Sequence, residues 1–216
     1  MRRSKFISAG LLVSLICLVL SGKSQEVSKY NLGVMLQKGQ LIITPANQTK
    51  ALENSLPGAV NTKGMVWLKD VGFTQGTIDI DLRGKNVFLQ SFPGIAFHGT
   101  DSSTYDLVYF RPFNFRYPDT ARRRWSVQYV SMPDFPWDTL RKRHPLAYEN
   151  SVTPIPEPDQ WFHATIVIKD GWVTVYVNHS EKPSLRVHLL NNRTSGGVAL
   201  WDDELSGDFA GLAITQ

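Results

Sequence analysis

The chain has 216 residues, of which 42% are hydrophobic and 19% are charged, so it is long enough to bury a sizeable core. It has one cysteine, which excludes a disulfide framework. Its formal charge of +4 equals the four basic residues of the first 24 positions, so the rest of the chain has 19 basic and 19 acidic residues, and the overall charge gives no support for nucleic-acid binding.

The first 24 residues have the pattern of a secretory signal peptide. A basic start precedes a short apolar run and small residues: Arg2, Arg3 and Lys5, then Ile7–Leu20, then Gly22 and Ser24. We expect cleavage before Gln25, a secreted or periplasmic protein, and one domain over residues 25–216 with no stable membrane insertion. The apolar run is too short to be a confident membrane span, which favours the signal peptide, and the alternative is an uncleaved N-terminal anchor. Cys17 lies in this segment, and Ile16 before it argues against lipidation.

After Gln25 the sequence is strand-like almost throughout, with short β-branched and aromatic runs separated by Gly, Asn, Asp and Pro. The predicted strands are Gln40–Thr44, Gly64–Leu68, Gly76–Arg83, Gly94–Gly99, Asp106–Phe113, Trp125–Ser131, Trp161–Lys169, Trp172–Val177, Ser184–Leu190, Gly197–Trp201 and Gly207–Thr215. Asp170-Gly171 predicts a two-residue hairpin turn of type I′. The pattern predicts an all-β fold, either a β-sandwich or a jelly roll.

One helical insertion interrupts the strands. Asp134 can cap a short helix from Phe135 to about Arg143, and Pro145 follows its end. Three prolines at 154, 156 and 158 then predict an extended return. A long excursion of this kind often carries binding groups, and the alternative is a structural flap over a sheet edge.

Four segments carry a family resemblance: GMVWLKDVGFTQGTIDIDLRG, GIAFHG, WFHATIVIKDGWVTVYVN and SGGVALWDD followed by GDFAGLAI. In this order they resemble the concanavalin A-like lectin/glucanase superfamily over roughly Gln40 to Thr215. The nearest types are laminin-G-like and 3-keto-disaccharide-hydrolase-like domains of secreted bacterial proteins. The resemblance implies two stacked antiparallel sheets, and a concave sheet that binds carbohydrate in many relatives. It does not by itself settle the function.

Aromatic and arginine residues concentrate between Tyr105 and Trp137, which holds 10 of the 24 aromatic residues and five arginines. Rings can stack on sugar C–H faces while guanidinium and amide groups bind hydroxyls, so this segment predicts a recognition surface. The candidate ligand-binding residues are His98, Tyr109, Arg111, Asn114, Gln128, Trp137, Arg141, Tyr148 and Glu149. Arg111 is expected either to pair with Glu149 or to bind ligand.

Evidence for catalysis is weaker. Glu149 and His98 are the candidates for acid–base chemistry, and no catalytic set is predicted. Asp79 and Asp81 partly match the acidic strand of family 16 glucanases, but Thr77 stands at the expected nucleophile position, and a solvent-facing polar side is the better interpretation. The sequence thus favours a carbohydrate-recognition module, with a glycoside hydrolase and a laminin-G-like protein-interaction module as alternatives.

No cofactor and no metal site is predicted, with one reservation for calcium. The acidic run Trp201–Glu204 could supply oxygen ligands to Ca²⁺, although a solvated turn is the simpler interpretation. The histidines at 163, 179 and 188 lack the spacing of zinc ligands.

Overall fold

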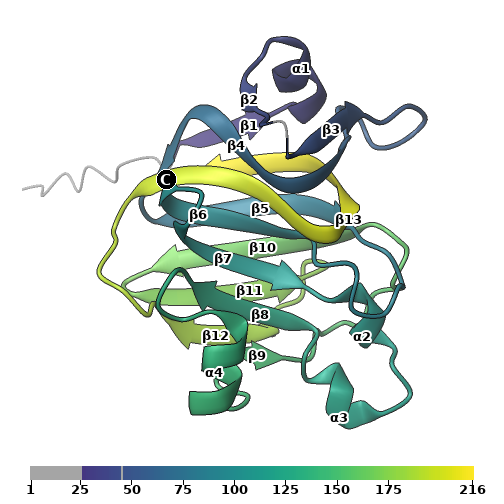
Figure 1. Cartoon of the computed structure of the whole chain (residues 1–216), viewed down its shortest axis with the longest axis vertical. Coiled ribbons are helices and arrows are strands. Elements are labelled where there is room, and N and C mark those ends of the chain that lie inside the picture. The colour runs from purple at the N-terminus through teal and green to yellow at the C-terminus, as the bar shows by residue number, and fades with distance from the viewer. Residues whose placement is uncertain (1–25, 45) are drawn as a thin grey trace, which may run out of the picture.

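The computed structural model describes residues 26–44 and 46–216, so the predicted signal segment and Gln25 lie outside the described residues. Strands make up 50% of the described residues and helices 11%, which confirms the all-β prediction (Figure 1). The strands are β1 (Val27–Tyr30), β2 (Leu41–Ile42), β3 (Gln48–Ala51), β4 (Val60–Phe73), β5 (Gly76–Arg83), β6 (Gly94–Asp101), β7 (Thr104–Phe110), β8 (Val127–Ser131), β9 (Glu149–Asn150), β10 (Phe162–Lys169), β11 (Trp172–Val177), β12 (Leu185–His188) and β13 (Gly196–Thr215). The helices are α1 (Leu32–Gln37), α2 (Pro112–Phe115), α3 (Thr120–Arg123) and α4 (Trp137–Arg143).

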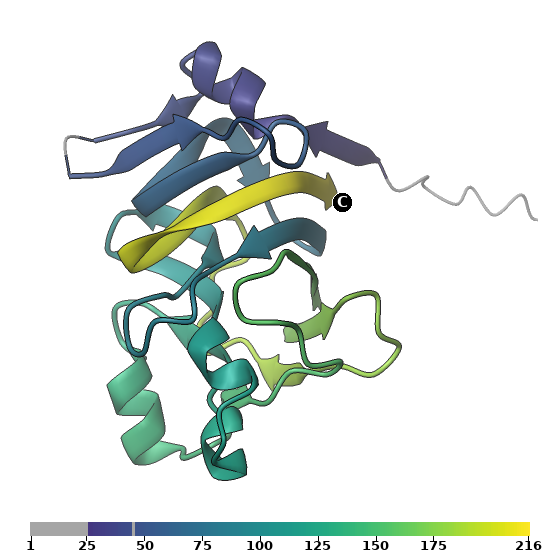
Figure 2. The same cartoon turned by 90° about the vertical axis from the view of Figure 1, so that its right-hand side faces the viewer.

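The long strand β13 joins the two layers of the sandwich. Its C-terminal half pairs with β5, which continues through β10 and β11 to β12, and we call these strands layer A. Its N-terminal half pairs with β6, which continues through β7 and β8 to β9, and we call these strands layer B. All of these pairings are antiparallel. Figure 2 shows the N-terminal elements beside β13 and the helices α2–α4 at the opposite end.

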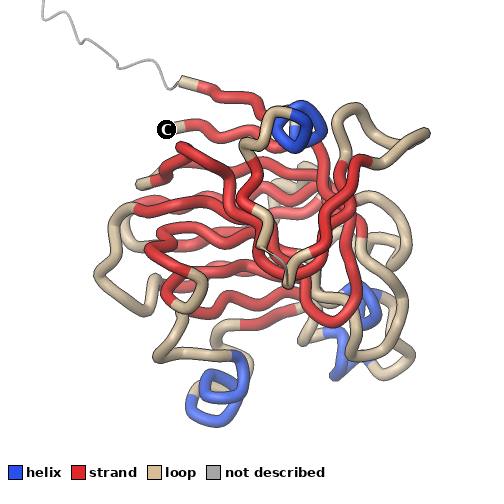
Figure 3. The backbone as a smooth tube through the Cα atoms, turned by 45° about the horizontal axis from the view of Figure 1, so that its top comes forward, coloured by secondary structure: helices blue, strands red, loops and turns tan. Residues whose placement is uncertain are grey.

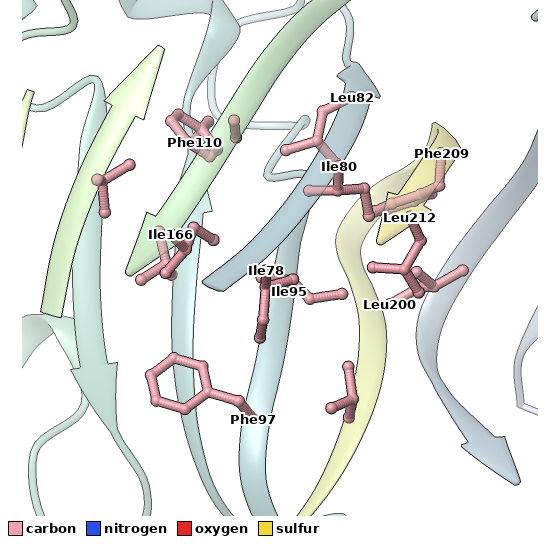
Figure 4. Close-up of a cluster of buried hydrophobic side chains, with 14 of the residues drawn as sticks. Ile78, Ile80, Leu82, Ile95, Phe97, Phe110, Ile166, Leu200, Phe209 and Leu212 are labelled. Carbon is pink, nitrogen blue, oxygen red and sulfur yellow. The ribbon is translucent and has the colours of Figure 1, made fainter. Parts of the chain in front are cut away.

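The main hydrophobic core lies between the two layers, as Figure 4 shows for its central part. Period-2 alternation sends Ile78, Ile80 and Leu82 of β5 inward, where they are completely buried. Ile95 and Phe97 of β6 and Phe110 of β7 enter the same cluster from layer B. The core therefore sets the register of both layers, because a one-residue slip would turn these side chains outward.

The helices are short and lie at the periphery of the strands (Figure 3). The predicted insertion helix is present as α4, but it begins at Trp137 with Pro136 as N-cap, so Asp134 does not cap it. Three further short helices, α1, α2 and α3, lie outside the predicted insertion. No helix in the described ranges has the length and apolar character that a bilayer crossing needs.

Three predicted strand boundaries are corrected. Gly197–Trp201 and Gly207–Thr215 are one strand of 20 residues, because a register shift between Asp202 and Gly207 absorbs the acidic run without ending the strand. Pro112 has no N–H and starts α2, so β7 ends at Phe110 and not at Phe113. The segment predicted as Gly64–Leu68 extends to 14 residues in β4.

The predicted hairpin turn is confirmed. Asp170 and Gly171 have φ values of 50° and 78°, and the positive sign at both positions is that of a type I′ turn. The turn fixes the β10–β11 register at Lys169 opposite Trp172.

The outward face of layer A carries the two carboxylates considered above as a catalytic pair. His163 of β10 contacts both of them, with Nδ1 2.8 Å from Asp81 and Nε2 3.2 Å from Asp79. Hydrogen bonds to Asp79 and Asp81 raise the pKa of His163 to about 9, and the pKa of Asp79 is lowered chiefly by its bond to His163. These groups form a partly exposed ionic cluster.

We predict that this cluster stabilises the fold in a pH-dependent way. The raised pKa of His163 means that its contribution is complete below about pH 6.5 and is lost as the pH rises through about 9. Solvent screening limits the contribution to about 1 kcal/mol. Urea denaturation should therefore show His163→Gln to be less stable than the natural protein at pH 6, with the difference vanishing near pH 10. His188→Gln is the control, and a difference that persists at high pH would contradict the ionic explanation.

Candidate functional site

A row of side chains crosses layer B on the face turned away from the main core, which we call the outer face. The strand register places Trp201 opposite Gly94, Gly94 opposite Tyr109, and Tyr109 opposite Gln128, which lies opposite Glu149. Gly94 lacks a side chain, and a Cβ there would collide with Tyr109. The Tyr109 and Trp201 rings consequently meet across it, edge to face, with centroids 5.4 Å apart.

Beside these rings lies a buried polar network. The Tyr109 hydroxyl donates to Gln128 Oε1 at 2.8 Å, and Arg111 donates through Nη2 to both of them. Arg111 also donates through Nη1 to the Trp125 carbonyl at 3.0 Å. Arg111 is only 5% exposed, and burial lowers its pKa, although an arginine stays charged in a protein. Burial raises the pKa of Tyr109 to about 12, so the phenol keeps its proton.

Glu149 provides the negative charge of this network. It is 3% exposed, and its Oε2 lies 3.6 Å from Arg111 Nη1. Arg141 of α4 reaches the same carboxylate in a bidentate arrangement, with Nη2 2.7 Å from Oε2 and Nε 3.1 Å from Oε1. One buried carboxylate is therefore shared by two guanidinium groups.

The helix α4 lies against the outer face through Leu140, which is buried in a cluster with Leu107, Tyr109 and Val130. Arg141 stacks between two indoles, with its guanidinium carbon 4.5 Å from the Trp125 centroid and 5.2 Å from that of Trp137. Together the helix and the sheet enclose a cavity of about 300 Å³, which we call the aromatic cavity. Its lining residues are Leu89, Phe92, Tyr109, Arg111, Trp137, Arg141, Trp201, Asp203 and Glu204.

Comparison with solved structures places the fold. The chain is similar to a protein of unknown function with a galectin-like fold from Bacillus subtilis, with a TM-score of 0.56 at 10% identity, covering 89% of this chain and 98% of that one. It is also similar to the carbohydrate-binding module CBM66 from Bacillus subtilis, with a TM-score of 0.51 at 12% identity, covering 78% and 94% respectively. The chain has the concanavalin A-like jelly-roll fold. No protein-family model and no curated protein matches its sequence.

Four of the predicted site residues line the aromatic cavity of this jelly roll: Tyr109, Arg111, Trp137 and Arg141. Gln128 and Glu149 lie behind them as hydrogen-bond partners. The question of whether Arg111 pairs internally has a clear answer, since it faces Glu149 as well as the cavity. Its placement in a strand beside Phe113 was wrong, because Arg111 is the N-cap residue of α2.

The other three predicted residues, Asn114, Tyr148 and His98, lie outside the aromatic cavity. Asn114 is buried in α2, where its Nδ2 donates to the Trp125 carbonyl. Tyr148 packs against Tyr129 and His144. Neither side chain lines the aromatic cavity.

His98 does not share a face with Tyr109, contrary to the alternation argument. Its φ of 50° breaks the alternation of β6, and its ring stacks on Phe73 of the main core. Its Nε2 bonds to the Thr74 carbonyl at 2.6 Å, and its Nδ1 lies 3.5 Å from buried Asp106. It lines a separate cavity of about 750 Å³, so His98 and Glu149 face no common space in which they could act together.

Sequence reasoning missed part of the cavity wall. Trp201 could have been found, because alternation within β13 puts it on the face of Ala199. Phe92 and Leu89 belong to a loop without periodicity, and Asp203 and Glu204 were considered only as a calcium turn. Nothing in the sequence pattern connects these segments with α4.

The calcium interpretation of the acidic run is not supported. Asp202 is fully buried, and burial raises its pKa to about 8. Its Oδ1 accepts from the Phe92 amide at 2.7 Å, which ties the cavity loop to β13, so the run is not a solvated turn either. In residues 26–44 and 46–216, no three His, Cys, Asp or Glu side chains are grouped to hold a metal.

We predict that Glu149 is required for stability. Changing Glu149 to Gln leaves Arg111 buried without a compensating charge, so the free energy of unfolding should fall by about 3 kcal/mol. Glu157→Gln is the matched control, because Glu157 forms a pair with Arg116 at 2.8 Å on the surface, where both side chains are more than half exposed. This control should cost under about 1 kcal/mol. Equal losses of unfolding free energy for the two variants in chemical denaturation would contradict a special role of Glu149 in stability.

Proposed function

We propose that the protein is a carbohydrate-binding module that takes a glycan into the aromatic cavity. The observation that carries this is the joint presence of aromatic rings and fixed donors in one hollow. Tyr109, Trp201 and Trp137 offer apolar surface for sugar C–H faces, and Arg111 and Arg141 offer N–H donors for ring oxygens.

The donors are held in place before any ligand arrives. Arg141 is fixed by Glu149 and by two indoles, and Arg111 by Tyr109, Gln128 and the Trp125 carbonyl. Fixing a long side chain in advance lowers the entropic cost of binding. The similarity in fold to a solved carbohydrate-binding module agrees with this proposal.

Binding without hydrolysis is the form that we propose. Retaining and inverting glycosidases both need two carboxyl groups that flank the scissile bond. Glu149 lies behind the arginines, which engage both of its oxygens, and Asp203 and Glu204 are adjacent residues of β13. These carboxylates therefore do not form a pair on the two sides of a bound sugar.

The N-terminal signal pattern supports placing the protein outside the cytoplasm, and N-terminal sequencing of exported protein should begin near Gln25.

Trp137 gives the direct test of the cavity. It is 52% exposed, so Trp137→Ala should leave the melting temperature nearly unchanged while removing stacking worth about 1 kcal/mol, which is roughly fivefold in affinity. The measurement is titration calorimetry against hits from a glycan array, with product analysis of the same mixtures. Trp172→Ala in β11 is the control, because Trp172 stacks on His188 in layer A. An affinity that survives the first change and falls with the second would place the site on layer A.

A further inference from the structure

Aromatic rings and arginines alternate along the surface next to the aromatic cavity. Arg122 lies 4.9 Å from the Tyr117 centroid and 5.7 Å from that of Trp125. The Arg141 guanidinium also lies over the Trp125 ring, and it lies over the Trp137 ring as well. The order is therefore Tyr117, Arg122, Trp125, Arg141 and Trp137, and we call this series the arginine ladder. It connects α3 with α4, which lie at the same end of the molecule in Figure 1.

The ladder links two hollows. The aromatic cavity lies at its Trp137 end, and a second cavity of about 240 Å³ lies at its Tyr117 end, lined also by Phe88 and Arg116. Consecutive residues of one loop reach both, since Phe88 lines the second cavity and Leu89 the first. Both side chains are exposed, and Phe88 supports Arg122 at 4.2 Å. The surface is therefore longer than one sugar pocket.

Arg122 is the cation of the ladder that no carboxylate of the described residues compensates, because Arg141 is paired with Glu149. Residues 116–143 contain seven Lys and Arg against three Asp, whereas residues 25–216 as a whole balance to zero. Across the described ranges, no carboxylate lies within 4.0 Å of Arg122. Its Nε is buried without a hydrogen-bond partner. A guanidinium stacked on a ring keeps its N–H edge free to meet a planar anion.

We infer that the arginine ladder extends the glycan site and selects acidic polysaccharides, those that carry carboxylate or sulfate groups. The inference rests on the proposed carbohydrate function and names its ligand class. Each sugar unit of such a polymer has a C–H face for a ring and an anionic group at its edge for a guanidinium. The alternation in the ladder matches this alternation in the ligand.

The spacing of the charges favours a polysaccharide over a nucleic acid. Arg122 and Arg141 contact the same indole, so their separation is no greater than the sum of the two cation–centroid distances, 5.7 and 4.5 Å. This upper limit on the separation fits a polymer that carries one anionic group on every sugar unit or on every second unit. Duplex DNA carries one charge per about 1.7 Å of its axis, and Asp203 and Glu204 at the aromatic cavity would repel so dense a polyanion.

The test compares one polymer backbone with and without its charge. Titration calorimetry of the purified protein should show binding of polygalacturonate, alginate or chondroitin sulfate, and at least roughly tenfold weaker binding of fully methyl-esterified polygalacturonate. Arg122→Gln should weaken binding of the acidic polymer about tenfold. Arg124→Gln removes the same charge from an exposed neighbour outside the ladder and should cost less than about twofold. Arg122→Lys, which keeps the charge but loses the planar fork, should be intermediate.

Four results would overturn the inference. Equal binding of esterified and free polymer, or of neutral glycans alone, would remove the charge selectivity and leave the carbohydrate function standing. Equal losses of affinity in Arg122→Gln and Arg124→Gln would show that the general positive charge of the surface, and not the ladder, attracts the polymer. Tighter binding of a single-stranded oligonucleotide would make the surface a nucleic-acid site. Binding of no glycan at all would reject the proposed function together with the inference. Melting curves establish that each variant is folded.

Discussion

The carboxylate of Glu149 is the charge on which the functional end of the molecule depends. It is buried at the edge strand β9 and pairs with Arg111 on the sheet side and with Arg141 on the helix side. A buried charge pair gains little net stability over apolar packing, but losing one partner is costly. The contact therefore serves mainly to fix geometry, since it ties α4 to the outer face and holds both guanidinium groups beside the Tyr109 and Trp201 rings. The cavity exists because this tie holds its two walls together.

The hydrophobic core and the proposed binding site use opposite faces of the same strands. In β7 the side chains of Val108 and Phe110 enter the core between the layers, while Leu107 and Tyr109 point to the outer face. The period of two separates the two roles residue by residue. A change at an outer-face position can alter the ligand without disturbing the core, except where a polar group is itself buried. Arg111 and Gln128 are such exceptions, so they link recognition to folding.

The sequence predicted the parts of this structure that follow local rules. Alternation located most strands, Asp170-Gly171 located the hairpin, the dense aromatic and arginine segment located three residues of the cavity, and the insertion helix located Arg141. It failed where tertiary contacts override local pattern. His98 leaves its expected face because a positive φ breaks the strand, and β13 runs through an acidic run that resembles a turn. Leu89 and Phe92 have no periodic signal, and their loop is held against β13 by hydrogen bonds from the Phe92 amide to Asp202 and from the Leu205 amide to the Gln90 carbonyl.

The formal charge of residues 25–216 is zero, but the fold brings arginines and aromatic rings together on one surface. Arg122 and Arg141 come from different helices, α3 and α4, and nothing in their spacing predicts that they share the Trp125 ring. Stacking on aromatic rings removes water from one face of the Arg122 guanidinium, which strengthens its interaction with an anion at its edge. A lysine could not replace such an arginine, because a point charge neither stacks nor offers two parallel donors. The physical character of this surface thus lies in the order of rings and cations and not in the total charge.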